Sequence, residues 1–300
     1  MKREKFHLSM MVSLLAGLVF VCAWSSMAGT VALFEEEKPE LISPLGKKLY
    51  AHPATGEELI KLKEDLKEAA KKLEANPEDP ENIIMYGRRL AYLWRYSEAI
   101  EVYSKGISKY PDNAMLYRHR GHRFISVRQY DKAVADLTKA SQLNDHDFDI
   151  WYHLGLAHYL RGEFEKAHWA YKECLAVSED DDSKIAISNW LYITLRRLGK
   201  KAEAEKVLEG ISKGMEVVEN QSYYNLLYLY QGLKSEAEVE KEATASALDL
   251  ATSGYGLGVW YLYNGKTEKA KAVFGKIVNT SYWPAFGYIA AEVELVRMNK

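Results

Sequence analysis

The sequence predicts an all-α solenoid, a stack of antiparallel helical hairpins. Small residues recur about every 34 residues, at Gly87, Gly121 and Gly155. Later glycines recur about every 33 residues, at Gly199, Gly232 and Gly265, and alanines keep step with both series, at Ala99, Ala133, Ala167, Ala204, Ala237 and Ala270. A fixed interval of this length indicates stacked two-helix units and leaves no room for a sheet.

The first element in the chain is an N-terminal apolar segment. Lys2, Arg3 and Lys5 precede an uncharged run, and small residues follow it in "SMA" before Gly29. This order is typical of a signal peptide over residues 1–28. We therefore expect an exported protein of the bacterial periplasm or the cell exterior. An uncleaved membrane anchor over residues 8–34 is the alternative, since that stretch is long enough to cross a bilayer.

Residues 29–55 contain three prolines and an acidic "EEEKPE" run, which predict an extended linker. An amphipathic N-terminal helix follows over residues 56–79. Its leucines recur at helical spacing from Leu59 to Leu73, and Pro77 predicts where the regular pattern stops.

The periodic residues resemble the tetratricopeptide repeat. The stretch "WYHLGLAHYLRGEFEKAHWAYKECL", residues 151–175, carries the aromatic, Leu-Gly, alanine and aromatic positions of that repeat, and "YGRRLAYLWRYSEAIEVYSKGISKYP", residues 86–111, is a second good copy. The strings "YRHRGHR" and "WYHLGLA" are similar to those of an exported bacterial subgroup of the family. The resemblance covers residues 57–298 and implies a right-handed solenoid with a concave groove.

Six repeats are expected over residues 80–283. Their approximate bounds are 80–113, 114–147, 148–184, 185–217, 218–250 and 251–283. Residues 284–300 are expected to form a capping helix, because an end repeat needs a cover for its exposed apolar face. Close helix packing also explains the glycine cluster "GYGLGVW", residues 254–260, which has no preceding strand and so does not fit a phosphate-binding loop.

Composition excludes several functional classes. The formal net charge is −2 at pH 7 with a pI near 6.5, which gives no basic field for general nucleic-acid binding. The two cysteines, Cys22 and Cys174, form no CxxC or zinc spacing, which argues against thiol redox chemistry and cysteine-based metal sites. Four histidines, His119, His122, His153 and His158, have no acidic residue in ligand spacing and stand beside arginines that disfavour a cation. We expect no metal and no cofactor.

The resemblance implies that the first helix of each repeat lines the concave groove. The residues at the corresponding positions are cationic and aromatic, and they form the predicted partner-binding set: Arg88, Tyr92, Arg118, His122, Tyr152, Tyr159, Asn189, Arg196, Arg197 and Tyr255. Arginine pairs bidentately with carboxylates, and tyrosine adds apolar contact area. Most of the other tyrosines are instead expected in the core of the repeats.

The run "YRHRGHR", residues 117–123, is predicted to place its side chains on two faces of one helix, the groove face and the buried face. Arg118 and His122 are four residues apart and should share the groove face of one helix. Arg120 stands where the repeat usually has leucine, so it should be partly buried and paired with Asp136 or Glu101. His122 would add a pH dependence near neutrality, because an unperturbed histidine has a pKa of about 6.5.

The sequence therefore predicts a non-enzymatic interaction module of the cell envelope. Its partner would be a protein or peptide that is acidic or bears a carboxylate, held in a cationic and aromatic groove. Two alternatives stay open: a structural or assembly scaffold that uses its convex side, and an envelope enzyme of unrecognised type. Nucleic acid is not expected as a partner, and a membrane only through an uncleaved N-terminal segment.

Overall fold

The computed structural model describes residues 38–51 and 54–299, and Lys38–Lys300 forms one compact unit. The predicted signal peptide or anchor, residues 1–28 or 8–34, lies outside these ranges. Within them, no helix combines the length and the apolar character that crossing a membrane requires.

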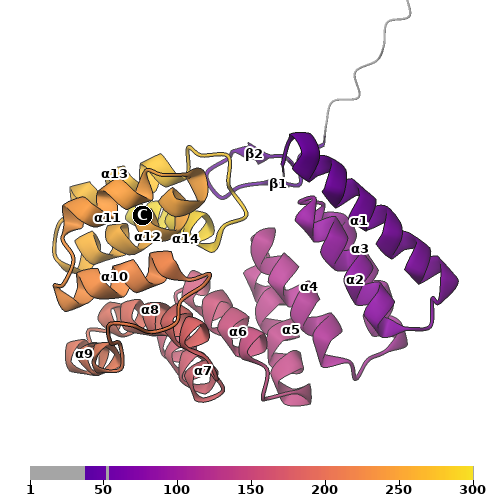
Figure 1. Ribbon diagram of the computed structural model, residues 1–300, viewed down its shortest axis with the longest axis horizontal. Helices are drawn as coiled ribbons and strands as arrows, with labels where there is room; N and C mark the ends of the chain where they lie inside the picture. The colour runs from indigo at the N-terminus through magenta and orange to yellow at the C-terminus, as the bar shows by residue number, and fades with distance from the viewer. Residues whose placement is uncertain (1–37, 52–53, 300) are drawn as a thin grey trace, which may run out of the picture. The chain divides into compact units, whose positions relative to one another are not determined.

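The described chain is an all-α solenoid, which confirms the predicted fold class (Figure 1). Helix α1 (Gly56–Ala75) ends before Pro77, as the sequence predicts, and packs against α2. Six antiparallel pairs follow. Their bounds are α2 (Pro80–Tyr92) with α3 (Tyr96–Lys109), α4 (Ala114–Ser126) with α5 (Tyr130–Leu143), α6 (Phe148–Arg161) with α7 (Phe164–Ala176), α8 (Asp181–Arg197) with α9 (Lys201–Glu209), α10 (Gln221–Gln231) with α11 (Glu236–Ala243), and α12 (Ala247–Tyr263) with α13 (Thr267–Ile277).

In two hairpins, the first helix begins earlier than the repeat period suggests. Helix α8 begins at Asp181 and α12 at Ala247, four residues before the predicted repeat bounds of 185 and 251. Both starts carry a capping residue: Asp180 accepts a hydrogen bond from the backbone N–H of Ser183, and Ser246 accepts one from Asp249. A side-chain cap satisfies an otherwise unpaired backbone donor and so fixes where a helix starts.

The recurring glycines and alanines set the distance between paired helices. A Cβ added at Gly155 would overlap the ring of Tyr171, and one at Gly258 would overlap Phe274. The glycine cluster of α12 is thus a packing feature, as expected. The fifth hairpin departs from the alanine series: Ala237 is exposed and Val239 is fully buried, because α11 begins four residues after Gly232 whereas α13 begins two after Gly265.

The turn inside each hairpin needs one residue in the left-handed backbone region. Glycines hold that position in the last four hairpins, with positive φ at Gly162, Gly199, Gly232 and Gly265. In the first two hairpins it is held by Trp94 (φ 58°) and Arg128 (φ 62°). A side chain in this region costs about 1–2 kcal/mol. These two side chains therefore need contacts that offset the strain.

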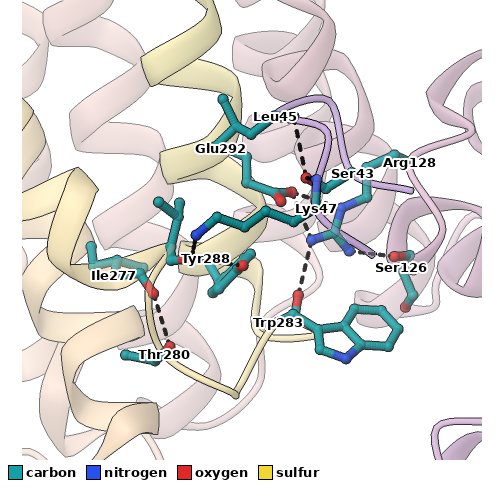
Figure 2. Close-up of polar contacts among 11 residues, drawn as sticks. Ser43, Leu45, Lys47, Ser126, Arg128, Ile277, Thr280, Trp283, Tyr288 and Glu292 are labelled. Atoms are coloured by element: carbon teal, nitrogen blue, oxygen red, sulfur yellow. Dashed lines mark hydrogen bonds and ion pairs between the residues drawn. The ribbon is translucent and has the colours of Figure 1, made fainter. Parts of the chain in front are cut away.

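Both side chains reach the residues that follow the last hairpin, 279–298, which we call the closing segment. It consists of a loop and helix α14 (Phe286–Met298), and α14 packs on α12 and α13. The ring of Trp283 packs edge-on against Trp94 and Tyr96, with ring centres 5.6 and 5.4 Å apart. The guanidinium of Arg128 lies between the carboxylate of Glu292 and the carbonyl of Trp283 (Figure 2).

Residues 38–51 hold a small two-stranded sheet, which the prediction of an extended linker over 29–55 did not include. Strand β1 (Leu41–Ile42) pairs antiparallel with β2 (Lys48–Leu49), and Ser43 Oγ accepts hydrogen bonds from two backbone N–H groups of the turn. Lys47 Nζ donates to the carbonyl of Val278 (2.6 Å) and to Asn279 (2.7 Å). This hairpin is therefore attached to the end of α13 and the start of the closing segment (Figure 2).

Candidate functional site

The candidate site is a pocket of about 170 Å³ between α2, α3 and α4, which we call the arginine pocket. Three arginines line it, one from α2 and two from α4, together with tyrosine and histidine rings and no carboxylate. The lining residues are Arg88, Ala91, Tyr92, Tyr103, Arg118, His119, His122 and Arg123. Helix α4 supplies this charge because its 13 residues include three arginines, two histidines and no acidic residue.

The three guanidinium groups differ in how their charge is compensated. Arg118 forms an ion pair with Asp149 of α6. Arg88 donates a hydrogen bond to the hydroxyl of Tyr92 (3.1 Å) and has no acidic partner in the described chain. The guanidinium of Arg123 makes neither a hydrogen bond nor an ion pair with any described residue, and it lies 5.3 Å from the ring centre of Tyr96. Two of the three cations thus remain available to an anion.

The histidines of the pocket are neutral at ordinary pH. Burial, followed by the charges of Arg118 and Arg123, lowers the pKa of His119 to about 2. Burial and the nearby Arg123 hold the pKa of His122 well below its usual value. The predicted pH response of His122 near neutrality is therefore wrong, because a half-buried imidazole beside arginines resists protonation.

A second pocket of about 490 Å³ adjoins the first and shares Arg118 and His122 with it. It adds Tyr152 and His153 of α6, Phe286 of the closing segment and four carboxylates, those of Asp147, Asp149, Asp182 and Glu219. The His122 and His153 rings are 4.1 Å apart between centres. In the described ranges, however, no three histidine, cysteine or acidic side chains come together as metal ligands would.

The structure divides the predicted partner-binding residues into an accessible and a covered group. Arg88, Tyr92, Arg118 and His122 line the arginine pocket, and Tyr92 keeps 43% of its surface exposed. Tyr152 lines the second pocket but is 8% exposed. The accessible group therefore comes from the first two hairpins, with Tyr152 at its border.

The covered group comes from α6, α8 and α12. Tyr159, Asn189 and Tyr255 are each at most 2% exposed. The hydroxyl of Tyr255 donates to that of Tyr159 (2.9 Å), and burial raises the pKa of Tyr159 to about 12. Asn189 accepts a hydrogen bond from the hydroxyl of Tyr230 (3.3 Å). These residues lie in the core, because α12 and α14 pack on the face that an open groove would present.

Arg196 and Arg197 also have partners inside the chain. The guanidinium of Arg196 lies 4.1 Å from the ring centre of Tyr263. Arg197 pairs with the buried carboxylate of Glu294 on α14 (2.9 Å). Neither arginine lines the arginine pocket, so the structure does not bring them together with Arg118.

Arg120 lies on the other side of α4, as predicted. It forms a two-point ion pair with Asp136, with Nε and Nη2 at 2.7 and 2.8 Å from the two carboxylate oxygens. A third hydrogen bond joins it to Ser104 (3.0 Å). Asp136 is the confirmed partner, whereas Glu101 is not.

Sequence reasoning missed Arg123 and Phe286 as site residues. Arg123 is one position beyond the groove face expected for α4, yet it lines the arginine pocket. The available signal was the lack of any acidic residue along α4, which leaves an arginine there without a neighbour to pair with. For Phe286 there was no such signal, because the repeat period says nothing about where the closing segment packs.

Comparison with known sequences identifies the repeat. The tetratricopeptide repeat family profile matches residues 118–173, and a second profile of that family matches residues 252–280. The chain is a tetratricopeptide repeat protein. The first match spans α4 to α7 and so includes Arg118, His122 and Arg123 of the arginine pocket.

Two curated relatives show how far this similarity extends. Tetratricopeptide repeat protein 12 of Mus musculus is 26% identical over 181 residues, 57% of this chain and 25% of that protein. Protein O-mannosyl-transferase TMTC3 of Homo sapiens is 27% identical over 199 residues, 63% of this chain and 21% of that protein. This chain therefore spans a quarter or less of the length of each of these two relatives.

Among solved structures, the chain is similar to YrrB, titled a TPR protein with an unusual peptide-binding site. The identity is 18% and the TM-score 0.45, over 70% of this chain and 91% of YrrB. A crystal structure of MamA gives 22% identity and a TM-score of 0.45 over 51% of this chain and 87% of MamA.

Proposed function

We propose that this tetratricopeptide repeat protein binds an acidic segment of a partner protein at the arginine pocket. The observation that carries the proposal is the set of Arg88, Arg118 and Arg123 around one pocket without a lining carboxylate. Guanidinium groups pair with carboxylates through charge-assisted, two-point hydrogen bonds. A pocket of about 170 Å³ suits a single carboxylate-bearing side chain or chain terminus rather than a folded domain.

The same geometry favours binding over catalysis. An arginine keeps its charge at any physiological pH, so it holds an anion well but does not exchange protons. His119 and His122 have pKa values far below neutrality, which makes them weak general bases. Export to the cell envelope belongs to the proposal as well, supported by the basic, apolar and small-residue order of residues 1–28.

The test uses a fluorescein-labelled hexaglutamate peptide and fluorescence anisotropy. We expect Arg123→Gln to weaken binding at least about tenfold, because a hydrogen bond to a charged group contributes about 1.5–3 kcal/mol. Arg118→Glu should abolish binding, since it reverses one charge and places a second carboxylate beside Asp149. The wild-type affinity should fall as salt rises from low to physiological concentration.

Lys172→Glu is the matched control, because Lys172 is exposed on α7 and does not line the arginine pocket. It changes the net charge as much as Arg118→Glu does, but away from the site. Equal affinities of the control and the two pocket variants, without salt sensitivity, would refute the anion site and favour the scaffold alternative. A hexalysine peptide should not bind.

A further inference from the structure

Helix α14 already presents carboxylates to arginines of the repeat array. Glu292 pairs with Arg128 (2.7 Å) and Glu294 pairs with Arg197 (2.9 Å), and both carboxylates are almost fully buried. Arg197 is one of the predicted partner-binding residues. The array beneath α14 therefore already binds two acidic side chains, at two separate arginines.

The first residue of α14 extends this contact to the accessible pockets. The ring of Phe286 lies 5.2 Å from that of His122 and 6.2 Å from that of Tyr152, between centres. It also forms part of the wall of the second pocket, next to Arg118. The closing segment thus occupies the space between the accessible and the covered groups of predicted residues.

The contact of the closing segment with the first two hairpins contains unfavourable elements. Arg128 holds the strained left-handed position of its turn, where the last four hairpins have glycine, and its side chain reaches Glu292. Oxygen Oε1 of Glu292 is buried and has no hydrogen-bond partner among the described residues. A buried ion pair contributes little net stability because both charges lose their hydration. This ion pair therefore adds little to what holds the closing segment in place, and buried apolar residues such as Trp283 and Ile289 supply the rest.

We infer that the closing segment is an internal occupant of the binding surface and that an acidic partner segment displaces it. The inference rests on the proposed function, because the displacing ligand is the one bound at the arginine pocket. The partner segment carries at least two carboxylates: one binds at the arginine pocket, and another replaces Glu294 at Arg197. Displacement moves Phe286 away from His122, at the border that the two pockets share.

The test variant is Arg128→Gly, with Arg128→Gly/Glu292→Gln as its partner. Glycine adopts the turn conformation without strain, as in the last four hairpins, so the turn itself should stay intact. The double variant also removes the carboxylate that the single variant leaves unpaired. Lys201→Ala is the control: it breaks an exposed ion pair with Glu205 within α9, a helix that packs on α8 and α10.

Hydrogen exchange measured by mass spectrometry reports opening without any ligand. We expect exchange in α14 to be at least about tenfold faster in Arg128→Gly than in the wild type, while α6 and α7 change little. The Lys201→Ala control should leave exchange in α14 unchanged. Unchanged exchange of α14 in Arg128→Gly would overturn the inference at its first step.

Binding of the labelled hexaglutamate peptide tests displacement. The double variant should bind about tenfold more tightly than the wild type, because a larger fraction of molecules then has the surface uncovered. Faster α14 exchange with unchanged affinity would mean that the closing segment is a cap only, which refutes the inference but not the proposed function. If no form of the protein binds the peptide while α14 still opens, the proposed function fails and the displacement fails with it.

Discussion

Replacing Asp136 by alanine is expected to lower the free energy of unfolding by about 3–5 kcal/mol. Asp136 is buried and accepts both hydrogen bonds of the Arg120 fork. Its removal leaves a half-buried guanidinium whose remaining acceptor is Ser104. Urea unfolding followed by circular dichroism at 222 nm measures the change.

A double variant separates the charge pair from the packing around it. In Arg120→Leu/Asp136→Leu, the leucine at position 120 restores the residue type that the repeat usually has there. The double variant also removes both charges. We expect it to be more stable than either single leucine variant, because no unpaired charge remains. Glu205→Ala is the control, since its pair with Lys201 is exposed and should contribute less than about 1 kcal/mol. A loss in Asp136→Ala no larger than in Glu205→Ala would contradict the prediction.

Gly287→Ala is expected to destabilise the protein by at least the upper end of the roughly 1–3 kcal/mol that overpacking usually costs. A methyl group there would overlap the backbone carbonyl of Ala251, because α14 crosses α12 at close approach. A backbone carbonyl inside a helix cannot turn aside as a side chain can. We therefore expect α14 to move off α12, with a lower melting temperature and faster exchange in α14.

Gly275→Ala is the same glycine-to-alanine change, but we expect it to stabilise the protein. No atom lies within 4 Å of the added methyl group on α13. Alanine is favoured over glycine inside a helix by about 0.5–1 kcal/mol, so this variant should melt at a higher temperature. Two variants that both melt higher than the wild type would show that α14 does not pack on α12 as described.

The hairpins could be predicted because their determinants are local. The interval between Gly121 and Gly155 fixes one repeat, and the substitution of leucine by Arg120 led to its buried partner Asp136. The prediction lost accuracy where the turn length changed, since the alanine series placed Ala237 in the core that Val239 occupies. The repeat period gives only the average spacing of the units, so it does not reveal a helix start that is shifted by two residues.

The division of the candidate site could not be predicted from the sequence. The pairing of Arg128 with Glu292 joins residues 164 positions apart, in units that are not neighbours in the stack. The repeat pattern describes only contacts within a unit and with the next one. It therefore placed Arg118 correctly beside Arg88 but gave no reason to expect Tyr159 and Tyr255 beneath other helices.

The position of Trp283 has a consequence for how the chain can evolve and fold. Its indole N–H donates to the carbonyl of Tyr50, 233 residues earlier, and its ring packs on the first hairpin. Tandem arrays usually tolerate the gain or loss of one unit, because each unit contacts only its neighbours. Here a duplicated or deleted hairpin would carry Trp283 away from Tyr50. The contact between the two ends therefore favours a fixed number of repeats and adds a slow, non-local step to folding.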